Sequence, residues 1–181
     1  VRALVLYASG SGFKSSAGYH TSSTAQGRLR QHRGREMGTR ALVHVHESSV
    51  DQAPILTIYR QFDGYPDGLG QEIADAFGQH RLVNGISPDM DESRIANRMG
   101  CLAAQIVSAL KKRVGNVEIM TPGISDVGEE YVYRVYANEP NGEGFDWSPG
   151  PIKFRCDGYG ETLFDGLLSE FDADSLHSED A

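Results

Sequence analysis

The sequence contains few cysteines and no long apolar run. Cys101 and Cys156 are the only cysteines among 181 residues, and no Cys/His cluster surrounds them. A disulfide framework or a zinc site of standard spacing is therefore not expected, and both thiols suit the core of a protein in a reducing cytoplasm. No stretch approaches the roughly 18 apolar residues that a membrane span requires, so no membrane partner is expected. These absences predict a soluble, cytoplasmic protein with a conventional hydrophobic core.

Acidic side chains are scarce in one part of the chain and abundant in the rest. Residues 1–36 hold six basic residues and one acidic residue, which gives a net charge of +5. Residues 37–181 hold 11 basic and 24 acidic residues, which gives −13. A domain with this charge repels phosphate backbones, which disfavours extended nucleic acid as a partner. A small anion, a metabolite or a second copy of the chain is still compatible with it.

The composition divides the chain into three predicted segments. Residues 1–36 are rich in Ser, Gly, Thr and Arg, and we expect them to be a disordered or non-native extension. A secretory signal, an organelle transit peptide and a misassigned start before Met37 are the alternatives, and the strand pattern directly after Met37 favours the last. Residues 37–171 are expected to form a single domain. Residues 172–181 read as an acidic disordered tail.

Apolar periodicity predicts eight elements in the order ββααβββα. Polar and Gly/Pro-rich stretches separate them, and residues 79–97 are expected to be a loop. The expected strands are 41–47, 55–62, 117–120, 130–137 and 152–156, and the expected helices are 69–77, 98–114 and 162–171. Strands and helices that occur in separate runs indicate an α+β fold. We therefore predict a mostly antiparallel sheet of about five strands with helices packed on one face.

Several segments carry a resemblance to known sequences. They are MGTRALVHV, IYRQFDGYPDGLG, VNGI, MGCLAAQIVSAL and GEEYVYRVY. These segments resemble a family of small uncharacterised conserved proteins from bacterial and phage genomes. The resemblance extends from Met37 to about Phe171 and implies one compact domain that begins at Met37. It implies no activity, cofactor or catalytic residue.

The loop from Asp63 to Gly70 is the first candidate ligand site. Its glycines permit close backbone approach, and the N–H groups at the start of a helix attract anions. Asp63 and Asp67 could instead hold Mg²⁺ or Ca²⁺. The ordinary interpretation is a strand-to-helix turn in which Asp67 caps the helix. The ligand-binding candidates are Arg60, Asp63, Gly64, Tyr65, Asp67, Gly68, Gly70 and Tyr133.

Two histidines define an alternative metal site. His44 and His46 are two positions apart on an expected strand, so their rings share one face. Asp63 or Glu130 would complete a set of two histidines and a carboxylate. Two histidines on the solvated face of a half-buried strand need no metal, however. Tyr and Arg on the strands that contain Tyr59 and Tyr136 could likewise stack on a nucleotide or simply pack across the sheet.

The leading functional hypothesis is a non-enzymatic binding or interaction domain, encoded by a phage or a mobile element. Its ligand would lie where the 63–70 loop meets the strand from Glu129 to Tyr136, and no cofactor is required by the sequence. The alternatives are a metal-dependent hydrolase or nuclease and a structural homo-oligomer. Convergence of His44, His46 and a carboxylate would favour the enzyme. An exposed sheet face with Tyr and Arg side chains would favour an interface.

Overall fold

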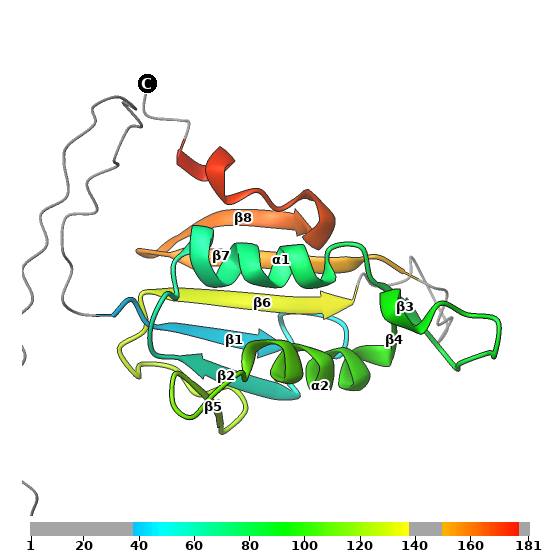
Figure 1. Ribbon diagram of the computed structural model, residues 1–181. Coiled ribbons are helices and arrows are strands. Elements are labelled where there is room, and N and C mark those ends of the chain that lie inside the picture. Colours follow the sequence, from blue (N-terminus) through cyan, green and yellow to red (C-terminus); the bar gives the residue numbers. More distant parts are fainter. Residues whose placement is uncertain (1–37, 138–149, 178–181) are drawn as a thin grey trace, which may run out of the picture. The chain divides into compact units, whose positions relative to one another are not determined.

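A six-stranded mixed sheet forms the centre of the protein (Figure 1). The structure is a computed structural model, which describes residues 38–137 and 150–177. The strands lie in the order β5-β2-β1-β6-β7-β8. Their bounds are β1 Ala41–Val45, β2 Leu56–Arg60, β5 Val117–Met120, β6 Tyr131–Ala137, β7 Ile152–Gly158 and β8 Glu161–Leu167. β1 and β6 are parallel and the other neighbours are antiparallel.

The parallel pairing of β1 with β6 determines how the chain crosses the sheet. Parallel neighbours need a long connection, and the chain between β2 and β5 supplies both helices. These are α1, Gln71–Phe77, and α2, Arg98–Leu110. The connection from β5 to β6 crosses the opposite face, because the Gly123 amide donates to Thr57 Oγ1 at 2.9 Å and Thr57 pairs with His44 on that face. Among the described residues, α1 and α2 lie on one face, here called the helix face, and neither lies on the other, here called the helix-free face.

Both helices cover the same face of the sheet (Figure 1). In α2, apolar residues recur at helical spacing and bury Met99, Leu102 and Ile106. They form one core cluster with α1 and with every second residue of the central strands, such as Val43 and Tyr133. The expected α+β class and the placement of the helices on one face agree with this arrangement.

The helix of residues 98–114 is shorter than predicted. It ends at Leu110, and Val114 is 99% exposed. Asn97 occupies the N-cap position without a side-chain capping bond, because its Oδ1 accepts from the Gly85 amide at 2.9 Å. Lys111 is the residue that follows the last turn of the helix. Its Nζ donates to the carbonyl of Val117 at 2.6 Å and thereby joins the end of the helix to β5.

The prediction of a helix at residues 162–171 is wrong. These residues form most of β8 and a short 3₁₀ turn, η3, at Leu168–Glu170. Tyr159 and Gly160 both have positive φ angles, 54° and 83°, which fit a tight hairpin turn from β7 to β8. Two of the apolar residues at helical spacing, Phe164 and Phe171, contact Phe154 in the core without belonging to a common helix. Pairing with β7 outweighs the local periodicity.

Other details of the predicted sheet also need correction. The sheet has six strands and is mixed, whereas five mostly antiparallel strands were expected. Residues 79–97 are not only a loop, because β3, Arg81–Val83, pairs in parallel with β4, Ile95–Asn97, after a 3₁₀ turn, η2, at Glu92–Arg94. Three-residue strands are too short to produce a readable alternation.

Disorder is predicted at both ends of the chain. The expected extension, residues 1–36, lies outside the described residues. The expected tail is described only as far as His177. Its first residues form a 3₁₀ turn, η4, at Ala173–His177, and Ala173 is buried against the core. The packed part of the chain therefore extends beyond Phe171.

The orientation of α2 gives a stability prediction. Ile106 is fully buried on the apolar stripe, whereas Ser108 is exposed on the other side of the helix. Ile106→Ala should lower the free energy of unfolding by about 2–5 kcal/mol, through lost transfer energy and a residual cavity. Ser108→Ala should change it by less than about 0.5 kcal/mol. Urea denaturation measures both, and equal effects would contradict this packing.

Candidate functional site

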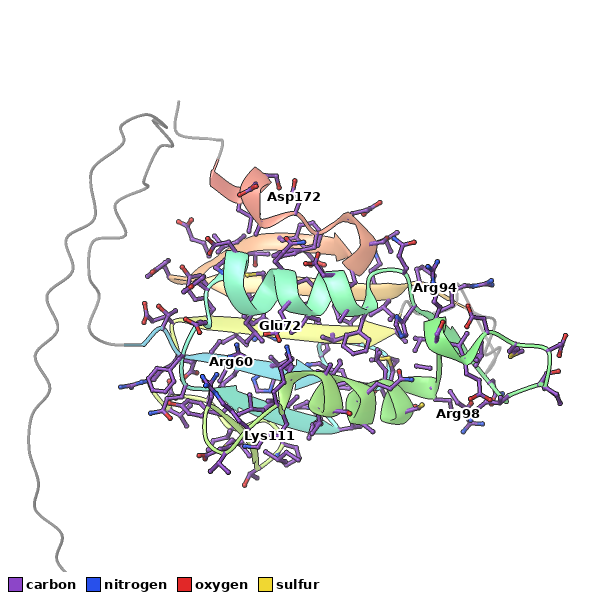
Figure 2. All side chains as sticks on the ribbon, in the orientation of Figure 1. Arg60, Glu72, Arg94, Arg98, Lys111 and Asp172 are labelled. Carbon is purple, nitrogen blue, oxygen red and sulfur yellow. The ribbon has the colours of Figure 1, made fainter. Side chains whose placement is uncertain are left out.

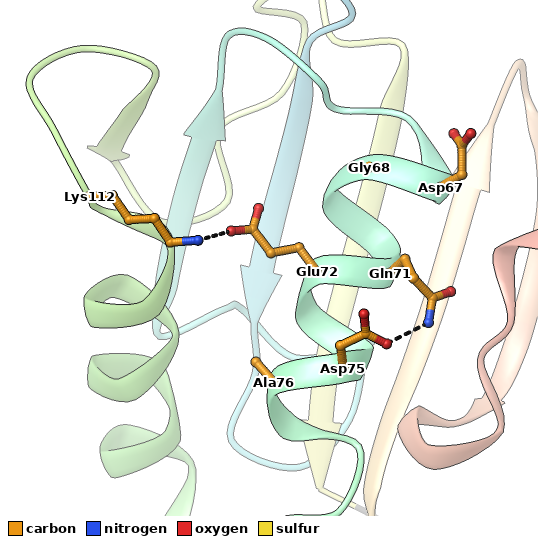
Figure 3. Close-up of a pocket in the computed structure, with 7 residues that line it drawn as sticks. All are labelled: Asp67, Gly68, Gln71, Glu72, Asp75, Ala76 and Lys112. Carbon is orange, nitrogen blue, oxygen red and sulfur yellow. Dashed lines mark hydrogen bonds and ion pairs between the residues drawn. The ribbon is translucent and has the colours of Figure 1, made fainter.

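Two adjoining cavities lie where β2 ends, α1 begins and α2 ends. The first, of about 520 Å³, lies along α1 and is drawn in Figure 3. The second, of about 360 Å³, lies between the ends of β2 and α2. Glu72 and Lys112 line both cavities. The remaining charged lining residues are Asp67 and Asp75 in the first cavity, and Arg60, Asp63 and Arg113 in the second.

Arg60 is the buried cation of this site. It is the last residue of β2 and pairs with Ala41, which directs its side chain to the helix face. The residue is only 9% exposed, and it lines the second cavity. Its Nε–H donates to the Phe62 carbonyl at 2.8 Å, and one terminal nitrogen lies 3.2 Å from Glu72. A guanidinium has five N–H donors, so others remain after these two contacts. No Arg60 nitrogen is among the buried unpartnered atoms of the described residues, so the remaining donors face the solvent of the cavity.

Glu72 lies between two cations. One of its carboxylate oxygens is 3.2 Å from Arg60 and the other is 2.8 Å from Lys112 Nζ. Figure 2 shows Arg60 and Glu72 on the helix side of the sheet, and Figure 3 shows Lys112 reaching Glu72 from the end of α2. Lys112 is 71% exposed, whereas the side chain of Glu72 is 28% exposed. Because Arg60 is more buried than Lys112, water and salt screen the Arg60–Glu72 ion pair less than the Lys112–Glu72 ion pair.

The predicted ligand loop contributes to the cavities only in part. Arg60 and Asp63 line the second cavity, and Asp67 and Gly68 line the first. Gly64 is packed against protein instead: its amide donates to the Thr39 carbonyl at 3.0 Å, and a Cβ there would meet Ala41 Cβ at 2.8 Å. Close backbone packing thus accounts for this glycine without a ligand.

The remaining predicted ligand residues face the protein interior or make local contacts. Tyr133 is fully buried, and its hydroxyl donates to the Gly64 carbonyl at 2.8 Å, so the expected meeting point of loop and strand is filled by a side chain. Gly70 packs against Tyr133 and Phe171. Tyr65 lies 3.5 Å from Asp63, and burial, together with the charges of Asp63 and Asp67, raises the pKa of Tyr65. Asp67 does not cap: the helical turn η1, Pro66–Gly70, begins after Tyr65 without a side-chain bond.

The structure does not bring the four expected metal ligands together. His44 Nδ1 lies 2.8 Å from Thr57 Oγ1, and His46 Nδ1 donates to the Gln52 carbonyl at 2.8 Å. Asp63 and Glu130 adjoin the opposite end of β1, where Gly64 bonds to Thr39 and Glu130 to Arg40. Across the described ranges, no three His, Cys, Asp or Glu side chains are grouped as a metal would need.

A network of polar side chains covers the helix-free face of β6, β7 and β8. Asp157 pairs with Arg134 and, at 2.9 Å, with Arg155. It also accepts from Thr162 Oγ1 at 2.7 Å. Tyr136 donates to Asp165 at 2.8 Å, and burial together with this bond raises the pKa of Tyr136 to about 12. Of these residues, only Arg134 and Tyr136 lie on a strand that the sequence marks out by its Tyr and Arg side chains.

Glu72, Lys112 and Arg113 are site residues that no pattern in the sequence indicates. The run from Lys111 to Arg113 suits the negative end of a helix dipole, which accounts for these cations without a ligand. Glu72 is an ordinary acidic residue in the first turn of α1, and no spacing rule links it to Arg60 on a strand. Only the tight Gly-rich loop between β2 and α1 could have suggested that these two residues meet.

No family model matches the chain, and no curated protein or solved structure matches it either. Within the described residues, no helix is both long enough and apolar enough to cross a membrane.

His44 makes stability depend on pH. Burial, with the positive charge of Arg134 and the neighbouring His46, lowers the pKa of His44 to about 4, although Glu129 opposes this. Between about pH 6.5 and pH 4, His44 binds a proton in the unfolded chain but stays neutral in the native protein. The contribution of neutral His44 to the free energy of unfolding should be fully present above pH 6.5. It should fall by up to about 1.4 kcal/mol per pH unit as the pH is lowered, until about pH 4, where the loss ends.

The His44→Gln variant isolates this contribution. Burial also lowers the pKa values of His46 and His80, so these residues likewise reduce stability as the pH falls. The contribution of His44 is therefore the difference in slope between the variant and the unmodified protein. Free energies of unfolding, measured in urea at several pH values from 7 to 4, should fall less steeply in the variant. Identical slopes would show that the pKa of His44 is the same in the native and the unfolded protein, and would contradict this prediction.

Proposed function

We propose that the protein is a non-enzymatic binding domain whose ligand carries a small oxyanion group. The anionic group lies in the cavity between the ends of β2 and α2, next to Arg60, Lys112 and Arg113. One observation carries this proposal: a nine-tenths buried arginine lines the cavity with N–H donors that have no described protein partner. These donors reach the solvent of the cavity, so they bind either water or a ligand.

The chemistry of the cavity supports an oxyanion over other ligands. A guanidinium fits the oxygens of a carboxylate or a phosphate through paired N–H bonds. Three cations line the cavity against two carboxylates, Asp63 and Glu72, although the net charge of residues 37–181 is −13. A local positive field within an acidic domain selects small anions and repels long polyanions.

The metal-dependent hydrolase or nuclease receives no support from the described residues. His44 and His46 are bonded to Thr57 and to the Gln52 carbonyl, at the other end of β1 from Asp63 and Glu130. Membership of the bacterial and phage family remains a prediction from the resemblance alone.

A structural homo-oligomer is the second candidate, and the network on the helix-free face favours it. Ion pairs hold Arg134 and Arg155 in place beside Tyr136, and ordered arginine and tyrosine side chains are common in protein interfaces. Light scattering across a concentration series would then show a dimer. Tyr136→Ala, which removes an aromatic side chain of this network, should weaken the dimer. A monomer at every concentration would remove this candidate.

The oxyanion proposal predicts saturable binding of inorganic phosphate. Lys112→Ala removes one cation from the cavity and should weaken phosphate binding about tenfold, the effect of losing a charge-assisted hydrogen bond of about 1.4 kcal/mol. Lys153→Ala is the matched control, since the same change is made on the helix-free face. NMR titration measures both affinities.

Phosphate salts also stabilise folded proteins nonspecifically, because they are excluded from the protein surface. Both variants share this effect, so comparing them accounts for it. Loss of affinity in Lys112→Ala alone supports the site. The absence of saturable phosphate binding by the unmodified protein would overturn the proposal.

A further inference from the structure

The Glu72 carboxylate already occupies a place that an oxyanion would take. Its two oxygens contact two different cations, Arg60 at 3.2 Å and Lys112 at 2.8 Å. It lines the cavity in which we place the ligand, together with Arg113. A ligand that binds Arg60 and Lys112 through the same donors must therefore displace this carboxylate.

We infer that Glu72 is a resident competitor that makes the site selective for phosphate monoesters over carboxylates. This inference rests on the proposed oxyanion site and specifies its ligand class. Exchange of Glu72 for a ligand carboxylate replaces one singly charged group by another of the same shape, so the electrostatic gain is small. Because Glu72 is tethered to α1, its effective concentration is high, and a free carboxylate competes poorly with it.

A phosphate monoester does not have this disadvantage. It carries a charge of about −1.5 to −2 near neutral pH and three terminal oxygens. Two oxygens can replace those of Glu72 on Arg60 and Lys112, and the third can reach another donor of Arg60 or the cation Arg113. The added charge and the added contact offset the loss of the Glu72 ion pairs.

The surroundings of Glu72 permit this exchange and set its cost. The side chain is 28% exposed and also lines the first cavity, of about 520 Å³, so it has space to rotate away from Arg60. Asp67 and Asp75 line that cavity, and their charges oppose the arrival of a third carboxylate. This repulsion holds Glu72 on the cations until a ligand with more than one negative charge arrives.

The experiment compares ethyl phosphate with propionate, two ligands of similar size. ¹H–¹⁵N NMR titrations measure both affinities in the unmodified protein and in Glu72→Gln, which keeps the side-chain shape and removes the competing charge. The unmodified protein should bind ethyl phosphate at least about tenfold more tightly than propionate. In Glu72→Gln both ligands should bind more tightly, and propionate should gain more, so that the preference narrows.

Two further variants make the result unambiguous. Glu161→Gln makes the same chemical change on the exposed strand β8 and should leave both affinities unchanged. Glu72→Asp retains the charge but is too short to contact both cations at once. If Glu72→Gln does not fold, Glu72→Asp decides, and propionate should bind to it more tightly than to the unmodified protein.

Each outcome has a distinct meaning. Suppose that the unmodified protein binds ethyl phosphate, but that the Glu72 variants bind each ligand no more tightly than the unmodified protein does. Glu72 is then not a competitor, and the inference fails while the oxyanion site stands. If ethyl phosphate binds neither the unmodified protein nor any Glu72 variant, the oxyanion site itself is rejected, and the inference with it.

Discussion

The hydroxyl of Tyr133 donates a hydrogen bond to the backbone carbonyl of Gly64, and much of the described structure is organised around this contact. Tyr133 is a central residue of β6, fully buried and stacked on Phe154 of β7. Gly64 belongs to the loop that leads from β2 into α1. A buried hydroxyl needs a partner, so the bond joins the middle of the sheet to the start of the helical layer. It thereby fixes where α1 begins.

The position of α1 in turn determines the site. Glu72 is in the first turn of α1, and it reaches Arg60 because the preceding loop is tightly packed between the sheet and the helix. An arginine buried without a counter-charge would be costly, so the Arg60–Glu72 pair is required for packing as well as suited to binding. The resident ion pair and the proposed ligand site are thus two consequences of one buried cation.

Much of the fold was predictable because local periodicity reports burial. The strands from Ala41, Val117, Tyr131 and Ile152, and the helix with Leu102 and Ile106, follow from apolar residues at spacings of two or of three to four. The same reasoning failed at residues 162–171, where Leu163, Phe164 and Leu167 have helical spacing. There the turn at Tyr159 and Gly160 and pairing with β7 determined the conformation, and neither is visible in the apolar pattern.

The sequence by itself determined which residues are apolar, where most elements lie, that residues 37–181 are acidic, and that Arg60 and Asp63 adjoin a Gly-rich turn. Only the tertiary structure decided which side chains meet. The antiparallel pairing of β1 with β2 places Asp63, and its parallel pairing with β6 places Glu130, at the opposite end of β1 from His44 and His46. The packing of α1 brings Glu72 between Arg60 and Lys112. Such contacts join residues up to 40 positions apart in the chain. They depend on strand order and loop geometry, which local spacing does not encode.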